Sequence, residues 1–484
     1  MQLISFKYLG INEYAARIPN AICGVLIALT LYKNGKRIYS TNFGMIWATV
    51  YMSMLLPQFY HRSGLLEPWF CFFIYLSLYN LSRVLEARQE RGEKFYRRKE
   101  IFSNLFYSVF AAVGAVLTKG IEGYLIVVLT YWLVFVLSTA KYGFGYSSIL
   151  KWTAYLILFI LIWIGIEYKW HGTDYLYSFF KYQIGELDIQ KATWTSRISF
   201  PALILFLGCF PASALAFNSV KIRSYESNIQ KIFRLTMISC LIIVLAISMF
   251  LKHKTAHFTV LAYFPISFLA AYSIRYVIEE TKAISKRTYA LLILGGLIWT
   301  ACLTVVPLVK ANLSLFQEYI HEDTLLLALS EHYEWEELEM IFGLSFFLIL
   351  MSSITLLVFN RRRLGLMILV FGTMVISNSV LLYYVPKIEQ ITQGPQVGFV
   401  KNNSMEEAYY HYHNGRSYIS NFYSDKALKN VLPFTKENIP QFKEPAIAHY
   451  LAIKTMDTMK IASFNKDLTF LYKQGIYSFY KLRK

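Results

Sequence analysis

The sequence predicts an all-α polytopic membrane protein of about twelve transmembrane helices, followed by a small α/β or α+β domain at the C-terminus. Its 484 residues are 56% hydrophobic and 16% charged, with a mean hydropathy of +0.40, which excludes a set of soluble domains. Apolar stretches recur that are long enough to cross roughly 30 Å of hydrocarbon as helices. This pattern stops near residue 385, so we expect a transmembrane domain over 1–385 and a separate domain over 386–484.

The predicted spans are apolar runs of 17 to 21 residues, separated by short polar segments that are often basic. They cover residues 15–32, 41–57, 64–82, 101–118, 121–140, 149–167, 198–218, 235–251, 256–276, 288–308, 338–358 and 364–384. All five cysteines lie inside these runs and follow neither a disulfide nor a zinc-ligand spacing, so we interpret them as packing residues.

Basic residues between the spans predict the orientation of the chain. One alternating set of loops (33–37, 83–100, 141–151, 219–234, 277–287 and 360–363) carries 22 Lys and Arg in 65 positions, whereas the other carries 9 in 79. The richer set is predicted to be cytoplasmic, which places the C-terminal domain on the extracytoplasmic side. The net charge of +18 is therefore interpreted as a topology signal and not as a nucleic-acid surface.

The C-terminal segment has its own local signals. Short β-prone pieces such as 416–423 (RSYISNFY) and 475–480 (GIYSFY) alternate with polar stretches, as in a small mixed domain. His411 and His413 form an HxH pair, for which a surface pair and a metal site are the two interpretations. The loops 168–197 and 309–337 are long enough to contain amphipathic helices.

Ionisable residues at the outer ends of the spans are candidate site residues, because charge near hydrocarbon is costly and often marks function. Four groups lie on the predicted extracytoplasmic side: 61–68 (HRSGLLEP), 118–123 (TKGIEG), the loop 168–197 with His171 and Asp174, and 252–257 (KHKTAH). Together they offer cations for a phosphate group and carboxylates for acid–base work. Snorkelling of Lys119 or Lys254, pairing of Arg62 with Glu67, and a hydrogen bond between helices for His257 are the structural alternatives.

Five ordered motifs resemble the bacterial branch of the GT-C membrane glycosyltransferases, the family of the lipid A aminoarabinose transferase and the protein O-mannosyltransferases. They are GINEYAARIPNA (10–21), HRSGLLEPWFCFFIYLSLY (61–79), LTKG (117–120), GCFPAS (208–213) and KTAHFTVLAYFPISFLAAY (254–272). The resemblance runs from residue 1 to about 280 and more loosely through 385–484.

The resemblance implies a multi-pass protein of the bacterial inner membrane that moves a sugar from a polyprenyl-phosphate carrier to a lipid, glycan or protein acceptor. Glu67 would stand where the family has an Asp, as an accessory carboxylate. Arg62, Lys119, Lys254, His257 and Tyr263 would bind substrate. The resemblance implies no cofactor and no nucleic acid partner, and although a divalent cation is compatible with the chemistry, the sequence contains no metal motif.

The sequence departs from this family at its start. Met1–Phe6 resembles the end of a family segment. In the family, a span and a first extracytoplasmic loop with an Asp-Glu pair precede this segment. We expect both to be missing here, since the first aspartate of the sequence is Asp174. A second departure is ATWTSRISF (192–200), where related sequences carry a Gly/His-rich piece. A gene start assigned at an internal Met and a true truncation both explain the missing start. The alternative functions are a polytopic transporter or lipid flippase, and a truncated non-catalytic protein derived from the same fold.

Overall fold

The computed structural model describes most of the chain. It covers residues 1–89, 94–138, 146–186, 194–219, 226–250, 256–280, 283–317, 326, 337–404, 407–412, 419–424, 427–428, 447–455, 457 and 467–483. These residues belong to two compact units. The first comprises Met1–Tyr8, Glu13–Trp299 and Ser345–Asn378, and the second comprises Leu9–Asn12, Thr300–Leu344 and Ser379–Lys484. The boundary predicted at residue 385 stays a prediction.

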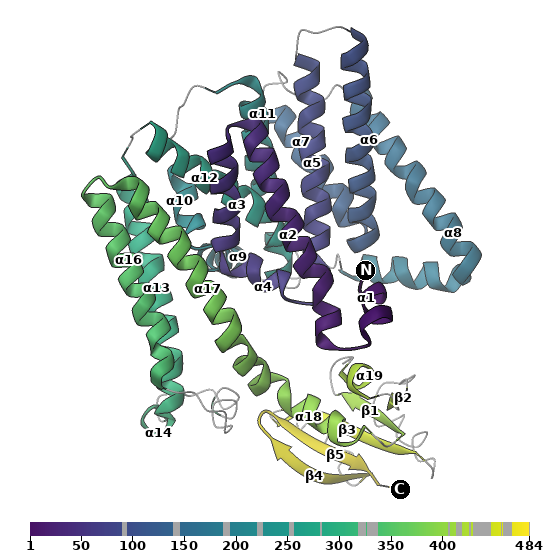
Figure 1. Cartoon of the computed structure of the whole chain (residues 1–484). Coiled ribbons are helices and arrows are strands. Elements are labelled where there is room, and N and C mark those ends of the chain that lie inside the picture. The colour runs from purple at the N-terminus through teal and green to yellow at the C-terminus, as the bar shows by residue number, and fades with distance from the viewer. Residues whose placement is uncertain are drawn as a thin grey trace. The chain divides into compact units, whose positions relative to one another are not determined.

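Helices account for nearly all of the first unit (Figure 1). In chain order up to residue 137, the helices of the whole chain are α1 (Gln2–Leu9), α2 (Glu13–Ile38), α3 (Thr41–Ser53), α4 (Leu55–His61), α5 (Glu67–Gln89), α6 (Lys94–Lys119) and α7 (Ile121–Leu137). The helices that follow are α8 (Tyr146–Glu186), α9 (Trp194–Gly208), α10 (Ala212–Ser219), α11 (Asn228–Phe250), the 3₁₀ helix η1 (Ala256–Ala262), α12 (Tyr263–Glu279), α13 (Lys286–Ala311), α14 (Leu313–Phe316), the 3₁₀ helix η3 (Glu337–Met340), α16 (Ile341–Val358) and α17 (Arg362–Thr392).

Every predicted span falls on one or two of these helices. Within the described ranges, eight helices are long and apolar enough to cross a membrane, and the bent pair of α9 and α10 makes nine. The apolar helix α7 is shorter than this test requires, and α3 and α5 also coincide with predicted spans. The prediction of a polytopic all-α membrane protein is confirmed.

Two predicted spans are interrupted. The run 41–57 divides into α3 and α4, because Met54 is extended (φ −75°, ψ 138°) and Pro57 falls in the first turn of the second helix, where its missing N–H costs nothing. The run 198–218 divides into α9 and α10, which meet at 105°. Pro211 lies at this break, and its lack of an N–H donor suits a position between helices.

Close approach of small residues and a buried aromatic cluster hold the first unit together. A Cβ added to Gly44 of α3 would lie 2.4 Å from the carbonyl oxygen of Tyr32 in α2, so only glycine allows this contact. The fully buried Trp47 ring contacts Tyr75, Phe233 and Phe268, and its Nε1 donates a hydrogen bond to Ser267 Oγ at 3.1 Å. The indole N–H therefore has a partner although it is buried.

The ends of the helices that are predicted to face the cytoplasm carry ion pairs. Arg37 donates to both carboxylate oxygens of Glu86, at 2.7 and 2.9 Å. Arg234 does the same with Glu226, at 3.1 and 3.0 Å. Both carboxylates are buried, so these bidentate pairs supply the partners that buried charges require.

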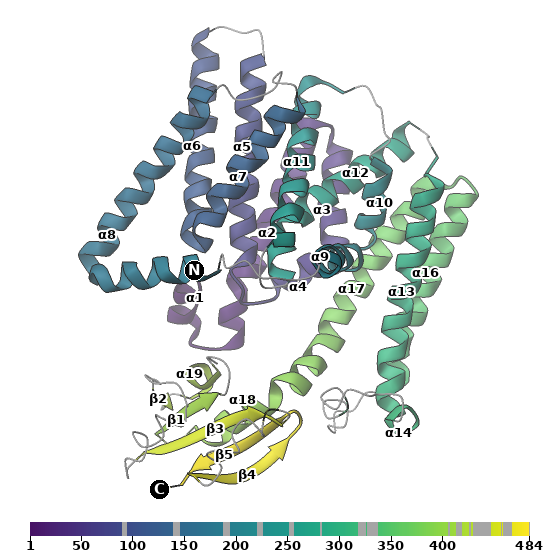
Figure 2. The same ribbon diagram turned by 180° about the vertical axis from the view of Figure 1, so that it is seen from behind.

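Helix α8 bends sharply at Gly172, where the backbone has φ 73° and ψ −171° (Figure 2). Glycine adopts this left-handed conformation without steric cost. The helix runs on to Glu186, so much of the predicted loop 168–197 is helical. Most of the predicted amphipathic segment 309–337 lies outside the described residues.

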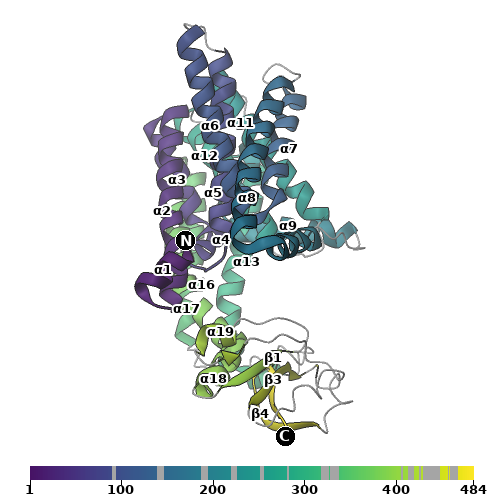
Figure 3. The ribbon, with the colours of Figure 1, turned by 90° about the vertical axis from the view of Figure 1, so that its right-hand side faces the viewer.

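The second unit contains a five-stranded mixed sheet in the order β2-β1-β3-β5-β4 (Figure 1), and Figure 3 shows its strands β1, β3 and β4 from another side. The strands are β1 (Ala408–Tyr412), β2 (Ala427–Leu428), β3 (Ala448–Lys454), β4 (Leu468–Gln474) and β5 (Tyr477–Leu482), and β1 pairs in parallel with β2 and β3. Phe399 and Val400 of α18 (Gly394–Asn402) join the apolar core of the sheet. This confirms the predicted mixed domain, but the β-prone piece 416–423 was wrongly predicted: Ile419–Tyr423 is the helix α19, whose Ile419 and Tyr423 pack against that core.

The predicted HxH pair is divided between described and undescribed residues. His413 lies outside the described residues. His411 is buried, and its Nε2 lies 3.0 Å from Nδ1 of His449 in the neighbouring strand. The surface interpretation of His411 is therefore wrong, because its ring stacks on that of the buried His449, with 5.3 Å between centroids.

Candidate functional site

Glu67 is the centre of the candidate site and the first residue of α5. It follows the loop 62–66, and Pro68 occupies the next position of the first turn, where a missing N–H is tolerated. The residue is 7% exposed, so its carboxylate needs partners that compensate for the loss of water.

Lys119 and His257 supply these partners from two distant parts of the sequence. Lys119 Nζ and His257 Nδ1 each lie 3.4 Å from the same oxygen, Oε1, of Glu67. Lys119 is the last residue of α6, and Gly120 with φ 72° lets α7 begin directly after it. His257 lies on η1 and is partly exposed. Three of the predicted site residues are thus brought together.

The second oxygen of the Glu67 carboxylate is the open position of the cluster. Oε2 is buried and accepts no hydrogen bond from any residue that the structure describes. An unsatisfied buried carboxylate oxygen is costly, and such atoms in native proteins are often satisfied by a ligand. A hydroxyl group that donates to Oε2 would complete the site.

Tyr60 extends the cluster beyond the predicted residues. Its hydroxyl lies 3.3 Å from His257 Nδ1, and its ring contacts that of Tyr263 with 6.1 Å between centroids. Burial, reinforced by the nearby Glu67, raises the pKa of the Tyr60 hydroxyl, so this group stays protonated at neutral pH. Tyr263 is fully buried behind Tyr60, and the substrate-binding role predicted for it stays a prediction.

The loop before Glu67 is held in place by side-chain amides. Asn20 Nδ2 donates to the carbonyl oxygens of Ser63 and Leu65, at 2.7 and 2.6 Å, and Gln2 donates to that of Gly64 at 2.7 Å. Asn20 is only 3% exposed, and its position within the predicted span 15–32 was the sequence signal that could have revealed it.

Arg62 and His61 lie in the same region but take different partners. Arg62 is exposed, and its guanidinium donates a hydrogen bond to Asn378 Oδ1 and makes no ion pair with Glu67. His61 is buried beside Tyr51, whose hydroxyl lies 3.2 Å from Nε2, and burial lowers the pKa of His61 to about 4. His61 is therefore neutral at physiological pH and adds no charge to the site.

A cavity of ≈110 Å³ opens beside the cluster of Glu67, Lys119 and His257. Lys119, Glu122 and His257 line it together with apolar residues of α5, α7, α11 and η1, which are Phe70, Cys71, Leu125, Ile126, Leu129, Val244, Ile247 and Leu261. Lys119 Nζ also lies over the Phe70 ring, 5.5 Å from its centroid. The cavity thus joins the Lys119 ammonium group and the His257 imidazole, with the Glu122 carboxylate in the same lining, to an apolar wall, which suits an amphiphile with a polar head.

The remaining predicted residues are not part of this cluster. Lys254 lies outside the described residues. His171, from the predicted loop 168–197, pairs instead with Glu167 one turn away, at 2.8 Å. In the portion of the chain that the structure covers, no three His, Cys, Asp or Glu side chains are grouped as metal ligands would be.

Comparisons with known proteins agree with the resemblance predicted above. The sequence model of the dolichyl-phosphate-mannose-protein mannosyltransferase family matches residues 2–174. No curated protein matches the chain at a significant level. Two crystal structures of ArnT from Cupriavidus metallidurans are similar to the whole structure, one bound to undecaprenyl phosphate (11% identity, TM-score 0.69) and one in the apo state (12% identity, TM-score 0.68). Each alignment covers 99% of this chain and 86% of the other. The chain is thus a multi-pass membrane protein with the fold of ArnT, and its N-terminal third carries the sequence signature of the dolichyl-phosphate-mannose-protein mannosyltransferases.

Proposed function

We propose that this protein is an integral-membrane glycosyltransferase that transfers a sugar from a polyprenyl-phosphate carrier to a hydroxyl group of a lipid, glycan or protein at the extracytoplasmic face. The family match over residues 2–174 and the fold shared with a protein that binds undecaprenyl phosphate support this function. The proposed location is the bacterial inner membrane, with the C-terminal domain outside the cytoplasm.

The observation that carries the proposal is the convergence of Lys119 and His257 on Glu67 beside an apolar cavity. A polyprenyl phosphate has an anionic head and a long apolar chain, and the cavity offers the Lys119 ammonium group and the His257 imidazole at one end of an apolar wall. In the proposed complex, Lys119 and His257 bind the phosphate, and the first isoprene units contact Leu125, Ile126 and Val244.

The proposed reaction breaks the bond between the anomeric carbon and the phosphate oxygen and forms a bond from that carbon to the acceptor oxygen, while the proton of the acceptor hydroxyl passes to the departing phosphate. The departing phosphate gains negative charge, which hydrogen bonds from Lys119 and His257 stabilise. Glu67 acts as an accessory carboxylate: Oε1 positions Lys119 and His257, and Oε2 accepts a hydrogen bond from a hydroxyl of the substrates. Arg62, Lys254 and Tyr263 are proposed as further substrate-binding residues.

Transfer from polyprenyl-phosphate-linked sugars by the purified protein in proteoliposomes tests the function. Formation of a glycosylated acceptor that depends on Lys119 and Glu67 would support the proposal. Movement of a lipid or solute across the bilayer without any covalent product would instead establish the transporter alternative. Full transfer by Lys119→Gln and Glu67→Gln would refute the assignment of the site while leaving the reaction intact.

A further inference from the structure

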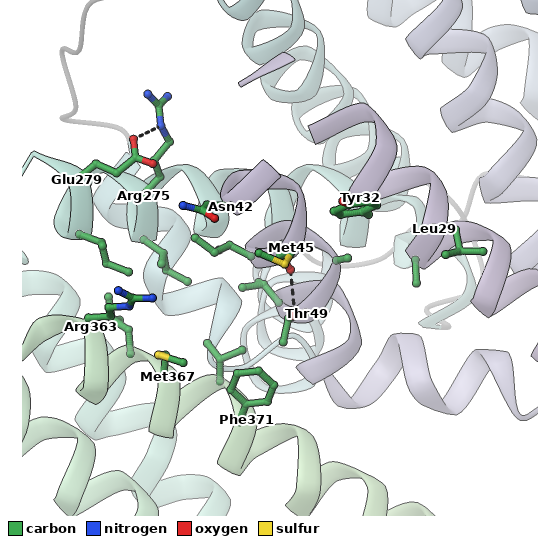
Figure 4. A pocket seen from close by; sticks show the side chains of 18 residues that line it. Leu29, Tyr32, Asn42, Met45, Thr49, Arg275, Glu279, Arg363, Met367 and Phe371 are labelled. Atoms are coloured by element: carbon green, nitrogen blue, oxygen red, sulfur yellow. Dashed lines mark hydrogen bonds and ion pairs between the residues drawn. The ribbon is translucent and has the colours of Figure 1, made fainter. Parts of the chain in front are cut away.

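A second and larger cavity lies at the opposite ends of the helices, where the predicted cytoplasmic loops meet. It has a volume of ≈620 Å³ and is formed by α2, α3, α12 and α17 (Figure 4). Its lining includes Tyr32 and Asn42, which flank the predicted cytoplasmic loop 33–37, and Glu279 and Arg363, which belong to two others. Three loops that the charge pattern assigns to one side of the membrane therefore surround one cavity.

The wall of this cavity is apolar and open to its surroundings. Leu29, Met45, Met367 and Phe371 line it and are 59%, 50%, 43% and 49% exposed (Figure 4). These side chains fall within predicted spans, and exposed apolar side chains on the spans of a membrane protein are suited to contact lipid chains. Both methionines are flexible and adapt their shape to an irregular ligand such as an acyl chain.

A strongly basic pocket adjoins the apolar cavity. It measures ≈570 Å³ and is lined by Val277, Ile278 and the segment Asn360–Leu364, which contains Arg361, Arg362 and Arg363. Ile278 and Arg363 line both cavities, so the apolar and the basic spaces are neighbours. The combined site has the two-part character of a phospholipid.

Two of the three arginines of the basic pocket, Arg361 and Arg363, have no acidic partner among the residues that the structure describes. Arg362 donates to Asn360 Oδ1 at 2.9 Å, and neither Arg361 nor Arg363 forms an ion pair with any residue that the structure describes. Glu279, the acidic residue in the lining of the two cavities, is already paired with Arg275 at 2.6 Å. Arg361 and Arg363 therefore contribute positive charge to the lining that Glu279 does not offset.

We propose that this site binds an anionic phospholipid of the cytoplasmic leaflet, with the headgroup phosphate on Arg361 and Arg363 and an acyl chain along Met45, Met367 and Phe371. Basic pockets between transmembrane helices on this side of a membrane are suited to anionic headgroups. The excess of arginine disfavours a zwitterionic lipid, whose own cation would be repelled. The site is separate from the Glu67 cluster and shares no lining residue with its cavity.

Native mass spectrometry of the whole protein from nanodiscs tests this proposal. The nanodiscs contain phosphatidylcholine with or without one fifth phosphatidylglycerol, and the bound lipid is identified by mass. We expect phosphatidylglycerol to be retained selectively by the wild type. Arg361→Gln/Arg363→Gln should weaken retention of phosphatidylglycerol by about 30-fold, which is roughly five- to sixfold for each arginine removed from the headgroup. Lys286→Gln/Arg287→Gln is the matched control, because these residues lie in a predicted cytoplasmic loop but line neither cavity, and it should retain the lipid.

A second variant tests the acyl-chain part of the site. Ala48→Phe places a ring in the apolar cavity and should also weaken retention, with transfer activity and gel filtration used to verify that each variant folds. Equal retention of both lipids by the wild type would overturn the proposal, as would equal losses in the arginine variant and its control. Inorganic phosphate that stabilises the protein against heat as much as phosphatidylglycerol does would indicate a phosphate site and refute lipid binding. An Ala48→Phe variant that retains the lipid like the wild type would do the same.

Discussion

Separate replacement of Glu67 and Lys119 by glutamine is expected to change carrier binding in opposite directions. Both residues belong to one ion pair, with 3.4 Å between Lys119 Nζ and Glu67 Oε1. If the pair were only structural, either change would damage the site in the same way, because each removes the same ion pair. If Lys119 binds a phosphate, however, the carboxylate competes with that phosphate for the same ammonium group.

The structure sets the size of both effects. Loss of a charge-assisted hydrogen bond from Lys119 should cost about 1.5–3 kcal/mol, so Lys119→Gln should weaken undecaprenyl phosphate binding by roughly 10- to 150-fold. A phosphate on the far side of Lys119 would lie roughly 6 Å from the carboxylate, where repulsion at an effective dielectric constant near 20 is about 3 kcal/mol. Partial exposure of Lys119 and His257 reduces this by about half, so Glu67→Gln should tighten binding by about tenfold.

Binding of undecaprenyl phosphate in nanodiscs, measured beside sugar transfer, decides between these accounts. Glu67→Gln should bind the carrier more tightly yet transfer about 100-fold more slowly, because its amide no longer accepts a strong hydrogen bond from a substrate hydroxyl. Glu167→Gln is the matched control, since Glu167 also pairs with a histidine, and it should leave both quantities unchanged. Weaker carrier binding by Glu67→Gln would refute the competition between carboxylate and phosphate.

Three further predictions concern the scaffold. Asn20→Ala should lower the free energy of unfolding by about 1–3 kcal/mol, because the carbonyl groups of Ser63 and Leu65 lose their donor. Asn80→Ala removes a hydrogen bond within one helix and should lower it less. Equal effects of the two changes in a thermal unfolding assay would contradict the role of Asn20 in holding the loop. Gly44→Ala should destabilise the protein by about 1–3 kcal/mol through its contact with a neighbouring backbone, whereas Gly165→Ala, with nothing within 4 Å, should be neutral in the same unfolding assay. Burial, with a smaller contribution from the neighbouring His449, lowers the pKa of His411 from its ordinary 6.5 to about 3. The unfolded chain therefore binds a proton at this residue more readily than the folded one below pH 6.5. The free energy of unfolding should then fall between pH 6.5 and pH 3, by up to about 1.4 kcal/mol per pH unit. Hydrogen exchange in β1, corrected for its intrinsic pH dependence, should follow this loss and become less pH-dependent in His411→Phe.

The helices were the most predictable part of the fold, because an apolar stretch of sufficient length has few alternatives in a membrane. Hydropathy averages over a window, however, and does not detect local breaks. The extended backbone at Met54 and the bend at Pro211 were missed for this reason. The α19 helix was missed because the β-propensity of an aromatic-rich piece depends on its neighbours in the fold.

The site was predictable only in part. Glu67, Lys119 and His257 occupy motifs far apart in the sequence, and the family resemblance indicated that they belong together before the distances were known. Tyr60 could not be singled out among 37 tyrosines, because only its approach to His257 distinguishes it. The pairing of Arg62 with Asn378 joins residues 316 positions apart and left no local signal.

A structure of the protein with undecaprenyl phosphate in a lipid nanodisc would test the central claim most directly. The account predicts density for the phosphate within about 3 Å of Lys119 Nζ and in contact with His257, with the isoprenoid chain following the apolar wall of the ≈110 Å³ cavity. Density for the phosphate away from both side chains, with the Lys119–Glu67 pair undisturbed, would contradict it.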